Sequence, residues 1–147
     1  LQSGQLSDSQ VERLIAVTSE ASQRHPKSEM LGMCVADLHG WVGNWDEATD
    51  AYQAVLVARP DSISALNNMA TFYFHQQKFA KAADSMSKAV AMLQRIHQGA
   101  DSMELATLLC NLAAIQLEQG NVEEAIRNNS AGEAMEARIL GKPGAKR

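Results

Sequence analysis

The sequence predicts an all-α fold made of repeated helix pairs, and three observations support this prediction. One pattern of small, turn-forming and large residues occurs three times along the chain. Each copy contains two stretches with apolar residues at intervals of three or four, the spacing that places side chains on one face of a helix. No segment is assigned as a strand. Together these features predict a solenoid of stacked helix pairs.

The three copies align through their alanines. The second copy follows the first by roughly 34 residues, a known repeat period, and the third comes after a longer interval. Alanine recurs where two antiparallel helices must approach closely, because a large side chain would hold the backbones apart. The recurring pairs are Ala36 with Ala48, Ala70 with Ala82, and Ala113 with Ala125.

Turn residues mark where these helices end and begin. Gly43 and Gly120 stand where a helix commonly ends in a left-handed residue. An Asn follows each of them with a Glu three residues later, the spacing of a capping box, so we expect each Asn side chain to accept a backbone N–H. The expected capping pairs are Asn44 with Glu47 and Asn121 with Glu124.

The pattern predicts seven helices. They span residues 8–24, 29–42, 45–58, 62–76, 79–97, 103–118 and 121–138. The first has a Ser9–Glu12 capping pair and no partner helix of its own. We expect it to cover the exposed end of the stack, because end units of a solenoid otherwise expose apolar surface. Its apolar stripe consists of Val11, Leu14, Ile15 and Thr18.

Composition narrows the function classes. The 147 residues fit one unit, with 46% apolar and 20% charged residues as in soluble globular proteins. No stretch approaches the roughly 18 apolar residues of a spanning helix, so we expect no membrane insertion. A formal net charge of −4 argues against general nucleic-acid binding, which needs a basic face. Two cysteines without a CxxC pair, and no secretory signal, predict a reducing, cytoplasmic compartment.

The first copy resembles the tetratricopeptide repeat, through Ala36, Gly43, Ala48, Tyr52 and Pro60. The likeness covers about residues 29–141 and implies a right-handed superhelix of about three repeats. Its expected divisions are a flexible N-terminus (1–7), a packing or capping helix (8–24), repeats at 29–61, 62–99 and 103–140, and a flexible basic tail (141–147).

The second and third copies are similar to the longer repeats of kinesin light chain. The similarity lies in the segments 65–70 and 110–113, the extended second helix of the second copy, and the final Leu140-Gly141. Asn129 and Gly132 depart from that subtype, where larger apolar residues or Ala are usual.

Stacked helix pairs present a concave surface lined by the first helix of each pair, where a peptide or partner helix binds. Asn68 and Asn111 occupy matching places there, and an Asn amide both donates and accepts, so we expect them to hold a peptide backbone. The alternative is that they bond neighbouring helices or water. The groove residues that the resemblance implies are Met33, Asp37, Trp41, Asn67, Asn68, Thr71, Phe74, His75, Asn111, Ala114 and Leu117.

One specific partner can be tested against the sequence. Tetratricopeptide co-chaperones hold the terminal carboxylate of heat-shock chaperones with a clamp of basic residues and two Asn. Of those places only Asn68 matches, and Met33, Asp37, Thr107 and Asn111 occupy the others. Asp37 would repel a carboxylate. We therefore expect no binding of chaperone C-terminal tails.

No catalytic constellation is recognised. The four His and two Cys form no HExxH, no CxxC and no Gly-rich phosphate loop, so we expect no enzymatic activity, metal or cofactor. His39 is expected in the core or at a helix interface. Cys34 and Cys110 are expected to be buried, inert thiols.

The sequence therefore predicts a non-catalytic protein–protein interaction module. It would act as a scaffold or adaptor that binds a peptide or helix of a partner in its concave groove. The alternative is a structural subunit domain that forms a homo-oligomer or joins a stable complex through helix edges.

Overall fold

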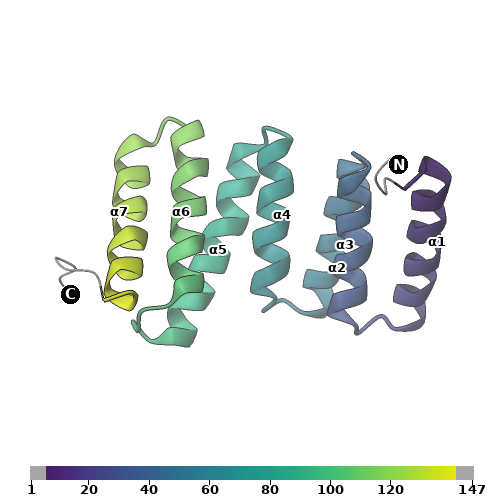
Figure 1. Ribbon diagram of the computed structural model, residues 1–147, viewed down its shortest axis with the longest axis horizontal. Coiled ribbons are helices and arrows are strands. Elements are labelled where there is room, and N and C mark those ends of the chain that lie inside the picture. Colours follow the sequence, from purple (N-terminus) through teal and green to yellow (C-terminus); the bar gives the residue numbers. More distant parts are fainter. Residues whose placement is uncertain (1–5, 142–147) are drawn as a thin grey trace, which may run out of the picture. The chain divides into compact units, whose positions relative to one another are not determined.

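The computed structural model describes residues 6–141, which form seven α-helices and no strand (Figure 1). The expectations of a flexible N-terminus and a flexible basic tail fall largely on residues 1–5 and 142–147, outside the described part. The helices are α1 (Asp8–Arg24), α2 (Glu29–Trp41), α3 (Trp45–Ala58), α4 (Ile63–His75), α5 (Phe79–His97), α6 (Met103–Glu118) and α7 (Val122–Ile139).

Every expected helix is present, and each boundary lies within one residue of its prediction. The all-α helical-repeat class is thereby confirmed. The period of the apolar residues was sufficient to locate the helices. Each helix buries one stripe of side chains and exposes the rest, which is the pattern that periodicity detects.

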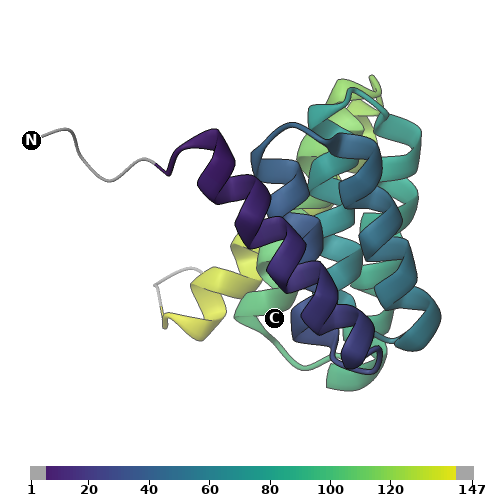
Figure 2. The ribbon, with the colours of Figure 1, turned by 90° about the vertical axis from the view of Figure 1, so that its right-hand side faces the viewer.

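The chain divides into two compact units, one up to Ala65 and one from Leu66 onwards. In the first unit α1 packs on α2 and α2 packs on α3. Figure 2 shows α1 inclined to these two helices. In the second unit α5 packs on α6 and α6 on α7. Most of α4 belongs to this unit and reaches α5 through the rings of Phe74 and Phe79, whose centroids are 5.5 Å apart.

Small residues lie at the helix contacts, as the repeat predicted. All six recurring alanines are buried, with at most 6% of their surface exposed. Large side chains complete the core between them. Tyr52 and Met86 are its largest fully buried members, and the Tyr52 hydroxyl donates a hydrogen bond to the Asp37 carboxylate.

Two glycines extend this close packing. A Cβ at Gly32 would meet Val55 Cγ2 at 2.5 Å, and one at Gly132 would meet Cys110 Sγ at 2.8 Å and the Ala106 carbonyl oxygen at 2.9 Å. The absence of a Cβ at Gly132 thus lets α7 approach the backbone of α6.

The three turns within the helix pairs share one backbone geometry. A residue with positive φ ends the first helix, namely Gly43 (83°), Gln77 (59°) or Gly120 (79°). The N–H of the next residue then bonds a carbonyl five residues back, as in Asn44 to His39 (2.8 Å). This Schellman arrangement satisfies carbonyls that the helix leaves unpaired. The same bond joins Lys78 to Tyr73 and Asn121 to Gln116, each at 2.9 Å.

The structure corrects the prediction that two Asn side chains cap helices. Asn44 and Asn121 do stand at the N-cap positions, but neither side chain makes the capping hydrogen bond. Their ψ angles are 69° and 65°, whereas the Ser caps Ser7, Ser28 and Ser102, which do bond, have ψ of 156°, 101° and 131°. The preceding left-handed residue sets this backbone, so the side chain is not placed over the first turn.

The structure also corrects the predicted capping pair of α1. Its capping box is formed by Ser7 and Gln10, two residues before the expected Ser9–Glu12 pair. Within the stripe, Val11 is 3% exposed and Leu14 is 42% exposed. Val11 is thus the one fully buried residue of α1.

The turn geometry generates a stability prediction at Gln77, which has a positive φ without being glycine. A left-handed conformation costs an ordinary residue about 1–2 kcal/mol, and the greater unfolded-state entropy of glycine offsets part of this. Gln77→Gly is therefore expected to raise the free energy of unfolding by about 0.5–1 kcal/mol in urea titrations.

Gly120→Ala is the matched control, because it places a Cβ at the equivalent position with φ of 79°. This substitution should lower the free energy of unfolding by about 1 kcal/mol. A Gln77→Gly protein less stable than the wild type would contradict the account of the turn.

Candidate functional site

A hollow on the second unit lies between α4, α5 and α6. Its volume is about 170 Å³, and no charged side chain lines it. Met86 of α5 and Ile115 of α6, which are 1% and 3% exposed, are the buried apolar members of its lining. The remaining lining residues are Thr71, Phe74, Asn111 and Ala114.

The polar side of the hollow consists of the Asn111 amide and the Thr71 hydroxyl. Asn111 Nδ2 donates to Asn67 Oδ1 at 3.5 Å, so this amide links α6 to α4. Thr71 Oγ1 donates to the Asn67 carbonyl oxygen at 3.1 Å. Asn111 keeps a second N–H and its carbonyl oxygen for further bonds.

Phe74 forms the aromatic side of the hollow and is held on two sides. Its ring meets Phe79 edge to face at 5.5 Å, and His75 at 6.2 Å. Phe79 is the first residue of α5, so the turn that follows α4 positions this aromatic pair. Such edge-to-face contacts favour one ring orientation.

The structure brings together part of the predicted groove set. Thr71, Phe74, Asn111 and Ala114 line the hollow, and Asn67 bonds to one of them. Asn68, the expected partner of Asn111, does not line it. The side chain on α4 that Asn111 contacts is that of Asn67, because the α4–α6 contact is offset by one residue from the sequence alignment.

His75 and Leu117 also lie outside this hollow. His75 is exposed near the end of α4. Leu117 lines a different hollow of about 400 Å³ between α6 and α7, together with Val122 and Ile126. All three of these apolar side chains are at least 49% exposed.

The three predicted groove residues of the first unit lie on α2. Met33 is half-buried, and Trp41 is 64% exposed. Asp37 accepts the hydrogen bond from Tyr52, so its carboxylate links α2 to α3.

Met86 and Ile115 are members of the hollow that sequence reasoning missed. The repeat pattern assigned Met86 to internal packing, which its burial agrees with, but a residue can be buried and still border a hollow. The one signal in the sequence that points to Met86 is its place on the inward face of α5, one turn beyond Ala82.

The cysteines correct a sequence expectation. Cys34 is exposed, not buried, because it lies on the solvent side of the short helix α2. Cys110 is half-buried beside Gly132. Burial raises the pKa of the Cys110 thiol, and the nearby Glu133 and Glu136 carboxylates raise it further. His39 is half-buried, and within residues 6–141 its Nδ1 atom is enclosed without a hydrogen-bond partner.

Two searches of the described residues gave negative results. None of their helices is long and apolar enough to cross a membrane. Among the same residues, no group of three or more His, Cys, Asp and Glu side chains is placed to hold a metal ion.

Comparisons with known proteins identify the repeat. The family model described as Tetratricopeptide repeat matches residues 61–131, which include the hollow. No curated protein matches the chain in sequence. Residues 61–131 thus carry the tetratricopeptide repeat signature.

Solved structures agree with this fold. The crystal structure of MamA protein is 12% identical with a TM-score of 0.75, over 94% of this chain and 70% of that one. BtubC (BKLC) from P. vanneervenii is 18% identical with a TM-score of 0.80, over 93% and 61%. The N-terminal domain of stress-induced protein-1 (STI-1) from C. elegans is 20% identical with a TM-score of 0.65, over 73% and 83%.

At these identities the likeness shows the fold alone. The chain spans about three fifths of BtubC and about seven tenths of MamA.

The two thiols generate a reactivity prediction. Because thiolate is the reactive form, an exposed Cys34 should react with Ellman's reagent at pH 8 at least about tenfold faster than Cys110, whose pKa is raised. The Cys110 rate should continue to rise with pH above the ordinary range of a thiol pKa, because burial raises the pKa of this thiol. Cys34→Ser and Cys110→Ser variants assign the two phases. Equal rates for the two thiols would contradict the described burial.

Proposed function

We propose that this protein is a scaffold or adaptor that binds a peptide segment of a partner across the α4–α6 face of its second unit. The observation that carries the proposal is the hollow bordered by Phe74, Ala114 and Asn111. It combines an apolar floor with one amide, a combination suited to an apolar side chain flanked by peptide backbone.

Size and chemistry define what the hollow accepts. A volume of about 170 Å³ accommodates one side chain and not a cofactor. No charged side chain lines it, so an uncharged apolar residue such as Leu or Met is the expected occupant. Asn111 can donate to the peptide carbonyl beside that residue, because one N–H of its amide remains available.

The predicted groove set enters this proposal with one change. Asn67 and Asn111 form the amide pair of the site, and Asn68 flanks it on α4. The kinesin-light-chain subtype, the absence of chaperone-tail binding and the cytoplasmic location remain predictions. The free thiols Cys34 and Cys110 are compatible with a reducing compartment.

A peptide-binding experiment tests the proposal. Extended 12-residue peptides are selected by phage display on the full chain, and dissociation constants are measured by fluorescence anisotropy. Ala114→Leu fills the hollow and should weaken binding at least about tenfold, while Asn111→Ala removes one hydrogen bond and should weaken it about fivefold.

Ala91→Leu is the matched control, since it makes the same change at an exposed position of α5 outside every hollow described above. Sedimentation velocity at micromolar concentration runs in parallel. If peptide affinity is the same for Ala114→Leu and the wild type, the groove proposal is wrong. If the chain is an obligate oligomer that Ala114→Leu disrupts, the structural alternative replaces it.

A further inference from the structure

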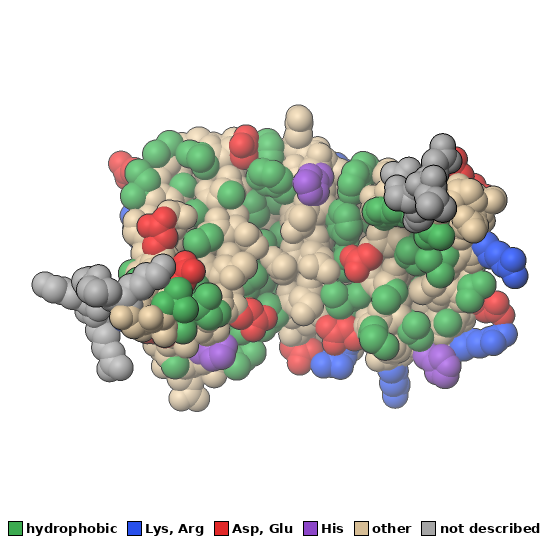
Figure 3. Space-filling model, in the orientation of Figure 1, with side chains coloured by type: hydrophobic (Ala, Val, Ile, Leu, Met, Phe, Trp, Pro, Cys, Tyr) green, Lys and Arg blue, Asp and Glu red, His purple; other side chains and the backbone are tan. Residues whose placement is uncertain are grey.

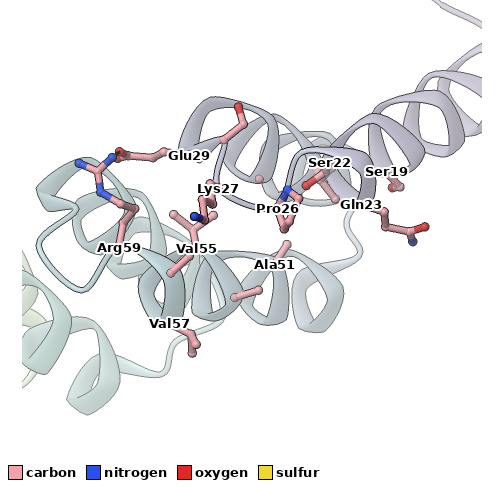
Figure 4. Close-up of a pocket in the computed structure, with 15 residues that line it drawn as sticks. Ser19, Ser22, Gln23, Pro26, Lys27, Glu29, Ala51, Val55, Val57 and Arg59 are labelled. Carbon is pink, nitrogen blue, oxygen red and sulfur yellow. Dashed lines mark ion pairs between the residues drawn. The ribbon is translucent and has the colours of Figure 1, made fainter.

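A larger hollow, of about 520 Å³, lies in the first unit between α1, α2 and α3 (Figure 4). It is separate from the predicted groove, because Met33, Asp37 and Trp41 are all absent from its lining. We name it the α1–α3 groove. Its two walls, its floor and one end differ in chemistry, and each limits what can occupy it.

The α3 wall is apolar and open to solvent. Ala51, Ala54 and Ala58 recur at helical spacing along it, and Val57 beside them is 83% exposed. Ala54 and Ala58 are exposed as well. At the positions 34 residues later, α5 has Ser85, Lys88 and Met92 instead. The apolar strip is thus a property of α3 and not of the repeat. Its small side chains let another backbone approach closely.

The α1 wall is polar and uncharged. It presents Ser19, Ser22 and Gln23 near the end of α1. None of these side chains makes a hydrogen bond within the described part of the chain, so all three are available to a ligand. Gly32 and Val55 lie on the floor, where the absence of a Cβ at Gly32 keeps α2 close to α3.

One end of the groove carries the charges. Figure 4 shows Glu29 and Arg59 together at this end, with Lys27 beside them. Glu29 is the only acidic residue in the lining and is already engaged, by the Ser62 hydroxyl and by Arg59 at 3.6 Å. Lys27 has no ion-pair partner among residues 6–141. The charge available to a ligand is therefore positive.

The surroundings do not extend this positive charge. Within residues 6–65 Asp and Glu outnumber Lys and Arg by nine to four, and Figure 3 shows side chains of both signs over the first unit. Arg24, the last residue of α1, pairs with Glu20, and Arg59 pairs with Asp61 as well as with Glu29. The positive charge that an acidic group can meet at this end is therefore that of Lys27.

We propose that the α1–α3 groove is a second docking surface, which takes an acidic amphipathic helix of a partner protein. The helix places apolar residues at i, i+3 or i+4, and i+7 against the alanines of α3. Its polar side faces the hydroxyls of α1. An Asp or Glu at one end of the helix pairs with Lys27.

The test uses a phage-displayed library of 16-residue helical peptides, selected on the full chain. The expected pool combines the apolar spacing with Asp or Glu at one end. For a selected peptide, Ala54→Glu should weaken binding at least about tenfold by placing a charge in the apolar wall. Ala91→Glu, the same change at an exposed position of α5, should leave the dissociation constant unchanged within about twofold.

A charge swap tests the polar end. Lys27→Glu should weaken binding about threefold to fivefold at low salt, and replacing the terminal acid of the peptide by Lys should restore it. Circular dichroism confirms that each variant is as helical as the wild type. Three results overturn the proposal. They are a pool without acidic residues at the end, binding that is indifferent to Ala54→Glu, and sedimentation showing that a second copy of this chain fills the groove.

Discussion

The close approach of paired helices at small residues is the constraint on which the rest of this structure depends. Each pair buries two alanines almost completely, and a Cβ at Gly132 would meet the Ala106 carbonyl oxygen where α7 packs on α6. Because backbones approach to this degree, large side chains are confined to the remaining positions. There they form the core, as Tyr52 and Met86 do. The hollows lie beside these contacts, so their positions follow from the same packing.

The turns show how one backbone geometry tolerates different sequences. Gly43, Gln77 and Gly120 adopt the same left-handed conformation, although only two of them are glycine. The backbone bonds that close the turn do not depend on side chains, which explains why Asn44 and Asn121 can occupy cap positions without capping. The left-handed conformation sets the backbone of the turn, and the type of residue that adopts it sets the conformational cost.

The sequence was sufficient for the fold, and it named part of the lining of the hollow. Helix positions follow from periodicity, which is a local property, and the recurring alanines are all buried. The hollow was predicted only in part. Thr71, Phe74, Asn111 and Ala114 were included, but the pairing of Asn111 with Asn67 depends on the offset between two helices, which no local pattern encodes. The predicted burial of Cys34 was wrong for a related reason. Apolar neighbours in the sequence do not decide which face of α2 is covered. The α1–α3 groove was not predicted at all, because its lining comes from three helices whose mutual packing no local pattern encodes.

The central claim is that small residues at the helix contacts determine how each pair packs. Its most direct test compares one substitution at two positions of α5, of which Ala82 is fully buried and Ala91 is exposed. The measurement is the free energy of unfolding in urea. The account predicts that Ala82→Leu lowers it by about 1–3 kcal/mol through overpacking. Ala91→Leu should change it by less than about 0.5 kcal/mol. An Ala82→Leu protein as stable as the Ala91→Leu protein would contradict the claim.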